Sequence, residues 1–176
     1  LGVDYEVHGF EAHPIYADRI ADRFSDNPNV HIHNRAISDK YETVKLYIER
    51  TGHGNSIYPT KVNIDINNYV ETKAISFAEW IEDNILDFKE SHNILRFNIE
   101  GAELPLFKQL VEKNMAKHFD VFLGSIHHDI PKVEELKPYY NYYINLLAEN
   151  NIKVKPYCFT LDCNVSLTKI VSELYE

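Results

Sequence analysis

The chain has 176 residues, of which 44% are hydrophobic and 12% are aromatic, enough for one folded domain with a hydrophobic core. Its formal charge is −9, from 18 basic and 27 acidic residues, so it offers no basic stripe for a phosphate backbone and no polybasic anchor for an anionic membrane. No apolar run approaches the roughly 20 residues that span a bilayer, and no signal peptide opens the chain. We therefore expect a cytoplasmic protein that binds neither nucleic acid nor membranes.

The N-terminal third of the chain alternates strand and helix patterns. Residues 5–10 are predicted as a strand, and Pro14 then suits the first turn of a helix, because the missing N–H of proline has no partner there in any case. Residues 30–37 carry a second strand pattern. Residues 43–50 alternate apolar and polar side chains, which predicts a half-exposed strand, and a loop over 51–60 follows.

The middle of the chain repeats this alternation. Residues 69–75 are predicted as a strand, after which Ser76 and Glu79 form a capping box that begins a helix. A strand over 94–100 and a helix over 104–114 follow.

The C-terminal third holds one more strand and helix and then two strands. The strand lies within 119–129, and the helix begins near Pro138. Residues 152–159 and 164–171 close the chain, and we expect them to pair antiparallel.

Strands that alternate with helices indicate an α/β fold, with a doubly wound, mostly parallel sheet that is covered by helices on both faces. We expect one domain over residues 1–176. In such sheets ligands bind beyond the carboxyl ends of the strands. Polar residues occupy those positions in four places, namely Glu11, the turn 36–39, residues 98–103 and residues 127–129.

Three blocks resemble the FkbM-type methyltransferases, in the family's order and at plausible spacing. They are "HGFEAHP", "NRAISD" and "LRFNIEGAE", and "VETKAISFAEWI" just before the third is similar to the family's approach to it. Together the blocks cover about residues 5 to 110. The resemblance implies a Rossmann-like fold, S-adenosylmethionine as cofactor, and transfer of a methyl group to a hydroxyl of a glycan or small metabolite.

The same resemblance implies roles for the first two blocks. Glu11 would hold the ribose hydroxyls of the cofactor, since a carboxylate can accept two hydrogen bonds from a cis-diol. The segment Ala36, Ile37 and Ser38, up to Asp39, would pass beside the adenine through backbone groups and the side chain of Ile37 or Ser38.

Two positions of the third block depart from the family. Its signature has lysine and aspartate where this chain has Arg96 and Asn98. Arg96 keeps the positive charge, although its planar fork differs from an ammonium. A carboxamide cannot act as a base near neutral pH, so Asn98 cannot take a proton as an aspartate could.

The family's first strand and its glycine-rich loop, which cradle the methionine half of the cofactor, have no counterpart in the sequence. That strand would be central, and without it a gap of roughly 9 to 10 Å would separate its neighbours. We expect the natural protein to be longer by a strand and a helix, roughly 30 residues or more.

Candidate catalytic residues are His127, Glu100 and Asn98. Methyl transfer to a hydroxyl depends on alignment and is helped by a base that titrates near neutrality, for which histidine is suited. His127 and the adjacent His128 point to opposite faces of a strand, and Asp129 could orient one ring. Glu103, three residues after Glu100, is expected to be a carboxylate at a helix N-terminus, with contact to substrate as the alternative.

Other functions are left open. The domain could be a non-catalytic Rossmann-like binding or scaffold domain, which Asn98 and the missing glycine loop favour. It could also be a metal-dependent hydrolase that uses residues 127–129, although no His-Glu-x-x-His spacing supports this. We expect no metal site, since His31 and His33 share a strand face without a third ligand nearby in sequence, and the two cysteines are expected to be reduced thiols.

Overall fold

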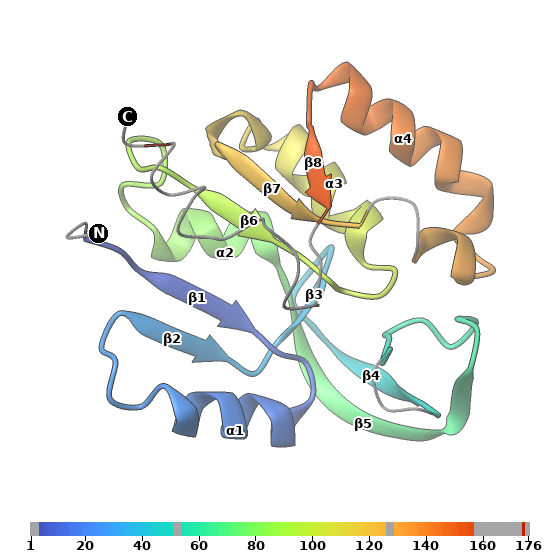
Figure 1. The fold of residues 1–176 in the computed structure, drawn as a ribbon. Coiled ribbons are helices and arrows are strands. Elements are labelled where there is room, and N and C mark those ends of the chain that lie inside the picture. Colours follow the sequence, from blue (N-terminus) through green and yellow to red (C-terminus); the bar gives the residue numbers. More distant parts are fainter. Residues whose placement is uncertain (1–3, 51–53, 126–128, 157–173, 175–176) are drawn as a thin grey trace.

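A computed structural model describes residues 4–50, 54–125, 129–156 and 174 of the chain (Figure 1). The four α-helices in this part are α1 (Pro14–Arg23), α2 (Phe77–Asn84), α3 (Glu103–Glu112) and α4 (Tyr140–Glu149). The strands are β1 (Val7–Phe10), β2 (Val30–His33), β3 (Ala36–Ser38), β4 (Glu42–Glu49), β5 (Ile64–Ser76), β6 (Ile94–Arg96), β7 (Val121–Gly124) and β8 (Val154–Pro156). Three short 3-10 helices join them at Ala116–His118, Ile130–Lys132 and Lys137–Tyr139.

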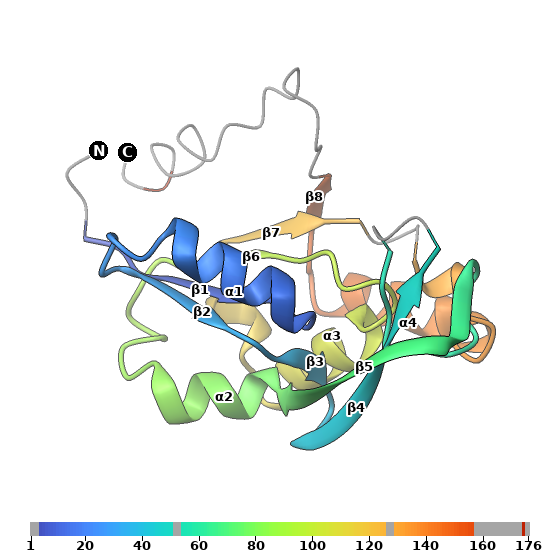
Figure 2. The same cartoon turned by 90° about the horizontal axis from the view of Figure 1, so that it is seen from below.

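The expected α/β class with mostly parallel strands is confirmed, but the described strands form three hydrogen-bonded sheets and not one. β1 pairs parallel with β2, and β6, β7 and β8 form a parallel sheet in that order. The third sheet has the order β3-β5-β4, in which β3 is parallel and β4 antiparallel to β5. Figures 1 and 2 show β1 and β6 as neighbours, yet no ladder joins these two strands.

The prediction of a single strand over residues 30–37 is wrong, because the chain turns between two shorter strands in this range. β2 ends at His33, whose carbonyl accepts a hydrogen bond from the Arg35 N–H at 2.9 Å. β3 then begins at Ala36 and pairs with β5 in a different sheet. The apolar residues on both sides of the turn hid it from the period-two pattern.

The last predicted strand pair lies partly outside the described residues. β8, within the predicted strand 152–159, pairs parallel with β7. Residues 164–171 are not among those that the structure describes, so the expected antiparallel pair stays a prediction.

The helix starts follow the sequence signals. α1 begins at Pro14, as predicted. α2 begins after Ser76, whose hydroxyl accepts the Glu79 N–H at 3.4 Å. The third predicted helix, α3, begins at Glu103 and the fourth, α4, at Tyr140, two residues after Pro138.

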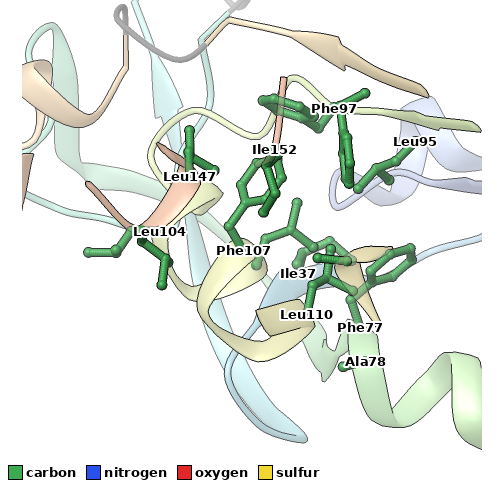
Figure 3. Close-up of a cluster of buried hydrophobic side chains, with 14 of the residues drawn as sticks. Ile37, Phe77, Ala78, Leu95, Phe97, Leu104, Phe107, Leu110, Leu147 and Ile152 are labelled. Atoms are coloured by element: carbon green, nitrogen blue, oxygen red, sulfur yellow. The ribbon is translucent and has the colours of Figure 1, made fainter. Parts of the chain in front are cut away.

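The hydrophobic core lies between the parallel strands β6 and β7 and the helices α2, α3 and α4 (Figure 3). Its centre is the apolar face of α3, where Phe107 and Leu110 have no exposed surface. Phe107 contacts the ring of Phe97 edge-on, with 5.1 Å between ring centroids. α1 lies apart from this core and packs beside β2 (Figure 2).

No helix in the ranges that the structure describes has both the length and the apolar character needed to cross a membrane.

Candidate functional site

The segments after β1 and β6 leave the same end of the structure, because these two strands run in the same direction (Figure 1). The first of these segments contains Glu11 and the second contains Asn98, Glu100 and Glu103. Glu11 and Glu100 make no hydrogen bond or ion pair with each other. The carboxyl ends of the strands therefore gather the predicted acidic residues at one end of the fold without joining them directly.

Glu11 is half-buried and holds its own loop. Its Oε1 accepts a hydrogen bond from the His13 N–H at 2.8 Å, and its backbone N–H donates to the His33 carbonyl at 3.0 Å. Among the described residues, Oε2 has no hydrogen-bond partner. The carboxylate is thus fixed by one oxygen and offers the other as an acceptor.

Asn34 fixes the Glu11 loop from the neighbouring strand. Its Nδ2 donates to the Glu11 carbonyl at 2.9 Å and to the Ala12 carbonyl at 3.1 Å. Asparagine suits this position because its amide supplies two donors. The asparagine of the block "NRAISD" therefore positions the loop that carries the predicted ribose-binding carboxylate.

The predicted adenine segment is buried. Ala36, Ile37 and Ser38 are 4%, 8% and 6% exposed, and Ile37 packs in the main core. The backbone of these residues pairs with β5, and the Ser38 carbonyl accepts a hydrogen bond from Gln109 Nε2 at 2.5 Å. The backbone of β3 is thus paired with β5 and its side chains are buried. A contact of this segment with adenine stays a prediction.

The turn after β6 holds two residues in left-handed backbone conformations. Glu100 has φ of 54° and Gly101 has φ of 115°. A Cβ on Gly101 would lie 2.8 Å from Val133 Cγ2, so this position has both a conformation and a space that favour glycine. A non-glycine residue with positive φ is uncommon and persists only when its surroundings hold it.

Three contacts hold Glu100 in this conformation. The Ser56 hydroxyl donates to the Glu100 carbonyl at 2.7 Å. The side chain of Glu100, 16% exposed, pairs through Oε2 with Lys61 Nζ at 2.9 Å. Lys61 is 6% exposed and also donates to the Gly54 carbonyl at 2.6 Å. The loop between β4 and β5 therefore fixes the Glu100 carboxylate.

Glu103 caps the same turn from the first residue of α3. Its Oε2 accepts the Gly101 N–H at 2.8 Å and its Oε1 accepts the Ile99 N–H at 3.3 Å. The residue is 1% exposed. Burial, together with the negative charge of Asp129, raises the pKa of Glu103 to about 7, although its backbone hydrogen bonds act in the opposite direction. The expected structural role of Glu103 at a helix start is confirmed.

A tyrosine lies in the same buried surroundings. Tyr143 on α4 has no exposed surface, and its hydroxyl has no hydrogen-bond partner among the described residues. Burial raises the pKa of Tyr143, and the charges of Glu103 and Asp129 raise it further. This hydroxyl is therefore protonated at neutral pH.

The remaining catalytic candidates receive less support from the geometry. Asn98 is exposed, and no hydrogen bond of its side chain occurs within the described ranges. Arg96 is also exposed. His127 and His128 lie outside the described residues, so their proposed roles stay predictions.

Histidine rings stack on the face of β1 and β2 that meets α2. His8 lies 5.0 Å from His31 and 5.5 Å from His33 between ring centroids, and Trp80 meets both His8 and His33 edge-on at 5.0 Å. His8 Nδ1 is 3.3 Å from His33 Nε2. Burial lowers the pKa of His8, and burial followed by the charge of His8 lowers the pKa of His33. At neutral pH, His8 and His33 therefore pack as neutral aromatic groups.

Metal binding finds no support in this part of the chain. Within residues 4–50, 54–125 and 129–156, no group of three or more His, Cys, Asp or Glu side chains could hold a metal ion. His31 and His33 stack with His8 instead.

Two residues that hold Glu100 in place carry no signal in the sequence. Lys61 lies in a loop with no motif around it, and Ser56 is one of several small polar residues there. Their positions opposite Glu100 depend on how the β4–β5 hairpin packs. Ser56 lies 44 residues before Glu100 in sequence, and local patterns do not reveal a contact over that separation.

A comparison of the chain with protein-family models, curated proteins and solved structures gave no match, so its function must be inferred from these residues and their geometry.

Proposed function

We propose that the chain is a Rossmann-like methyltransferase domain that uses S-adenosylmethionine to methylate a hydroxyl of a glycan or small metabolite. The proposal combines the resemblance of three ordered sequence blocks with the mixed α/β architecture and its parallel strands. Ligands of parallel α/β sheets bind beyond the carboxyl ends of the strands.

One observation carries the proposal. The loop after β1 presents a half-buried carboxylate, Glu11, with one oxygen fixed at 2.8 Å by His13 N–H and the other without a partner in the described part of the chain. The free oxygen of this fixed carboxylate can accept a hydrogen bond that a ribose hydroxyl donates. Asn34 supports this loop from β2 with two hydrogen bonds.

Glu100 suits a positioning role better than that of a base. Its carboxylate is paired with Lys61 at 2.9 Å, which fixes its direction. A fixed negative charge can orient a hydroxyl group of the acceptor by accepting its hydrogen bond. The bound cofactor would supply the methyl group on its sulfonium, and alignment of the acceptor oxygen is what this chain must provide.

A non-catalytic binding domain is the second candidate, and a specific observation favours it. The exposed Asn98 stands where the family has an aspartate. Glu103 has a pKa of about 7, which would suit a base, but the residue is 1% exposed and its carboxylate accepts hydrogen bonds from two backbone N–H groups. Neither group can take a proton from a substrate in this geometry.

Calorimetric titration of the protein with S-adenosylmethionine tests the proposal. Saturable binding supports both candidates that use the cofactor, and methylation of a hydroxyl compound then separates an enzyme from a binding domain. An absence of binding at millimolar cofactor would reject the methyltransferase proposal.

A further inference from the structure

Arg35 lies between two hollows at the point where β3 separates from β5. The first hollow, of about 440 Å³, and the second, of about 310 Å³, are both lined by Asn34 and Arg35. The β3–β5 ladder begins at the pair Ala36 and Ala74, so Asn34 and Arg35 diverge from β5 and open a fork, while the preceding residues of β5 stay paired with β4.

The guanidinium of Arg35 has no acidic partner in the described part of the chain. Its Nη1 donates to the Asn34 carbonyl at 2.7 Å, which leaves its other N–H groups available. The residue is half-buried in a protein with a formal charge of −9. The planar fork of its guanidinium matches a phosphate or carboxylate.

The second hollow adds donors around this cation. It is also lined by Thr43, Thr72 and Lys73, and by one acid, Glu71. Lys45 is the cross-strand partner of Glu71 in the β4–β5 register, so a positive charge compensates this acid. Arg35 and Lys73 leave the fork with net positive charge.

Thr43 and Lys73 share one face of the sheet in this hollow, because they are cross-strand partners on β4 and β5. Both side chains are exposed, and the Thr43 hydroxyl makes no hydrogen bond within the ranges that the structure describes. A hydroxyl can donate its hydrogen to an anion, so Thr43 adds a donor beside the two cations.

The first hollow presents aromatic rings. His33, Tyr41 and Trp80 line it, together with the apolar side chain of Ile75. The charges of Asp83 and Glu79 act on Tyr41 and help to raise its pKa, after burial, which is the largest cause. An anionic group is thus disfavoured at the Tyr41 end and favoured at the Arg35 end.

We propose that this pair of hollows binds a flat aromatic ligand that carries a phosphate or carboxylate group. The anionic group lies at Arg35, Thr43 and Lys73, and the ring lies against Tyr41 and Trp80. This site is separate from the ribose role of Glu11 and does not depend on the proposed function.

Titration with four small probes at fixed ionic strength tests the wild-type site. Phenyl phosphate and benzoate combine a ring with an anion, whereas inorganic phosphate and phenol each carry only one of these. We expect a ring-bearing anion to bind at least about tenfold more tightly than inorganic phosphate or phenol. Tighter binding of phenyl phosphate assigns a phosphate ligand, and tighter binding of benzoate assigns a carboxylate. Equal, weak binding of all four probes would overturn the proposal.

Variants locate the binding. Arg35→Gln should weaken the better probe by roughly tenfold or more, while Arg23→Gln, which removes the same charge from the exposed surface of α1, should leave its affinity unchanged. Thr43→Val should weaken binding by about fivefold and should not lower the urea midpoint of the free protein, because it removes an exposed hydroxyl that makes no hydrogen bond within the described ranges. Equal losses in the two arginine variants, or unchanged affinity in Thr43→Val, would contradict the site.

Discussion

Lys61 and Glu100 join two loops that lie far apart in sequence, with 2.9 Å between Nζ and Oε2. The side chain of Lys61 is 4% exposed and that of Glu100 is 16% exposed. Because Glu100 has a positive φ of 54°, this ion pair and the hydrogen bond from Ser56 offset a backbone conformation that costs about 1 to 3 kcal/mol. The β4–β5 loop is therefore part of the candidate site.

Replacement of Lys61 with methionine should destabilise the protein by about 3 kcal/mol, because it leaves a largely buried carboxylate without its cation. Urea unfolding measures this free energy. The double variant Lys61→Met with Glu100→Gln should recover part of the loss, since no charge then remains to be paired.

The exposed pair of Lys113 and Glu82 is the matched control. Its atoms lie closer, at 2.6 Å, but its side chains are 36% and 46% exposed. Lys113→Met should therefore cost much less stability than Lys61→Met. Equal costs at the two lysines would show that burial of the Glu100 pair is unimportant.

Acid should destabilise the protein through His8 and His33. Both have a pKa below the usual value of 6.5 in the folded state, so the unfolded chain binds more protons when the pH falls. Their contribution to stability is complete above pH 6.5 and is lost as the pH falls below it.

Urea unfolding at pH 7.5 and pH 5.5, two settings roughly one unit on either side of the usual histidine pKa, measures this loss. His8→Phe should reduce the difference between the two values, because phenylalanine keeps a ring in the stack and takes no proton. His92→Gln, at a histidine whose side chain is 46% exposed, should leave the difference in place. A wild-type stability that does not change on acidification would refute this role of the stack.

Glu103 should act in the opposite pH direction. Its pKa in the folded state is raised to about 7, from a usual value of 4.5, so its contribution is complete below pH 4.5 and is lost as the pH rises through about 7. Glu103→Gln loses one of two backbone acceptors at every pH, which costs about 1 to 3 kcal/mol. The Glu103→Gln variant does not lose stability as the pH rises through about 7, because glutamine does not ionise.

The gap in unfolding free energy between the wild type and Glu103→Gln should therefore shrink between pH 5 and pH 8, a range set on either side of the folded pKa of about 7. Unfolding curves for both proteins across this range provide the test. A gap that stays constant, or grows with pH, would mean that Glu103 is charged throughout.

Local sequence patterns predicted the elements better than their assembly. The Ser76 cap and Pro14 at N1 fixed two helix starts within a residue, because these signals act within one turn of helix. The split between β2 and β3 was missed, since Asn34 and Arg35 form a turn between two apolar runs. Division of the strands into three sheets depends on pairing over long distances, which no local period specifies.

The candidate site was also predicted only in part, because part of it depends on contacts between residues far apart in sequence. Post-strand position correctly gathered the segments of Glu11 and Glu100 at one end of the fold (Figure 1). Burial of Ile37 and Ser38 in β3 could not be predicted, because it depends on packing against Gln109 and β5. Lys61 was missed, since a lysine in a loop is normally solvated and only the packed structure places it 6% exposed beside an acid.

The affinity of S-adenosylmethionine for Glu11→Gln, compared with that for the wild type, tests the central claim most directly. Glutamine keeps a carbonyl for the His13 N–H and replaces the open oxygen with an amide NH₂, so the loop stays capped while a ribose hydroxyl loses its acceptor. We predict a roughly tenfold loss, about 1.4 kcal/mol, and no change for Glu90→Gln at an exposed position. Equal affinity of the wild type and Glu11→Gln would contradict the assignment of this carboxylate to the methyl donor.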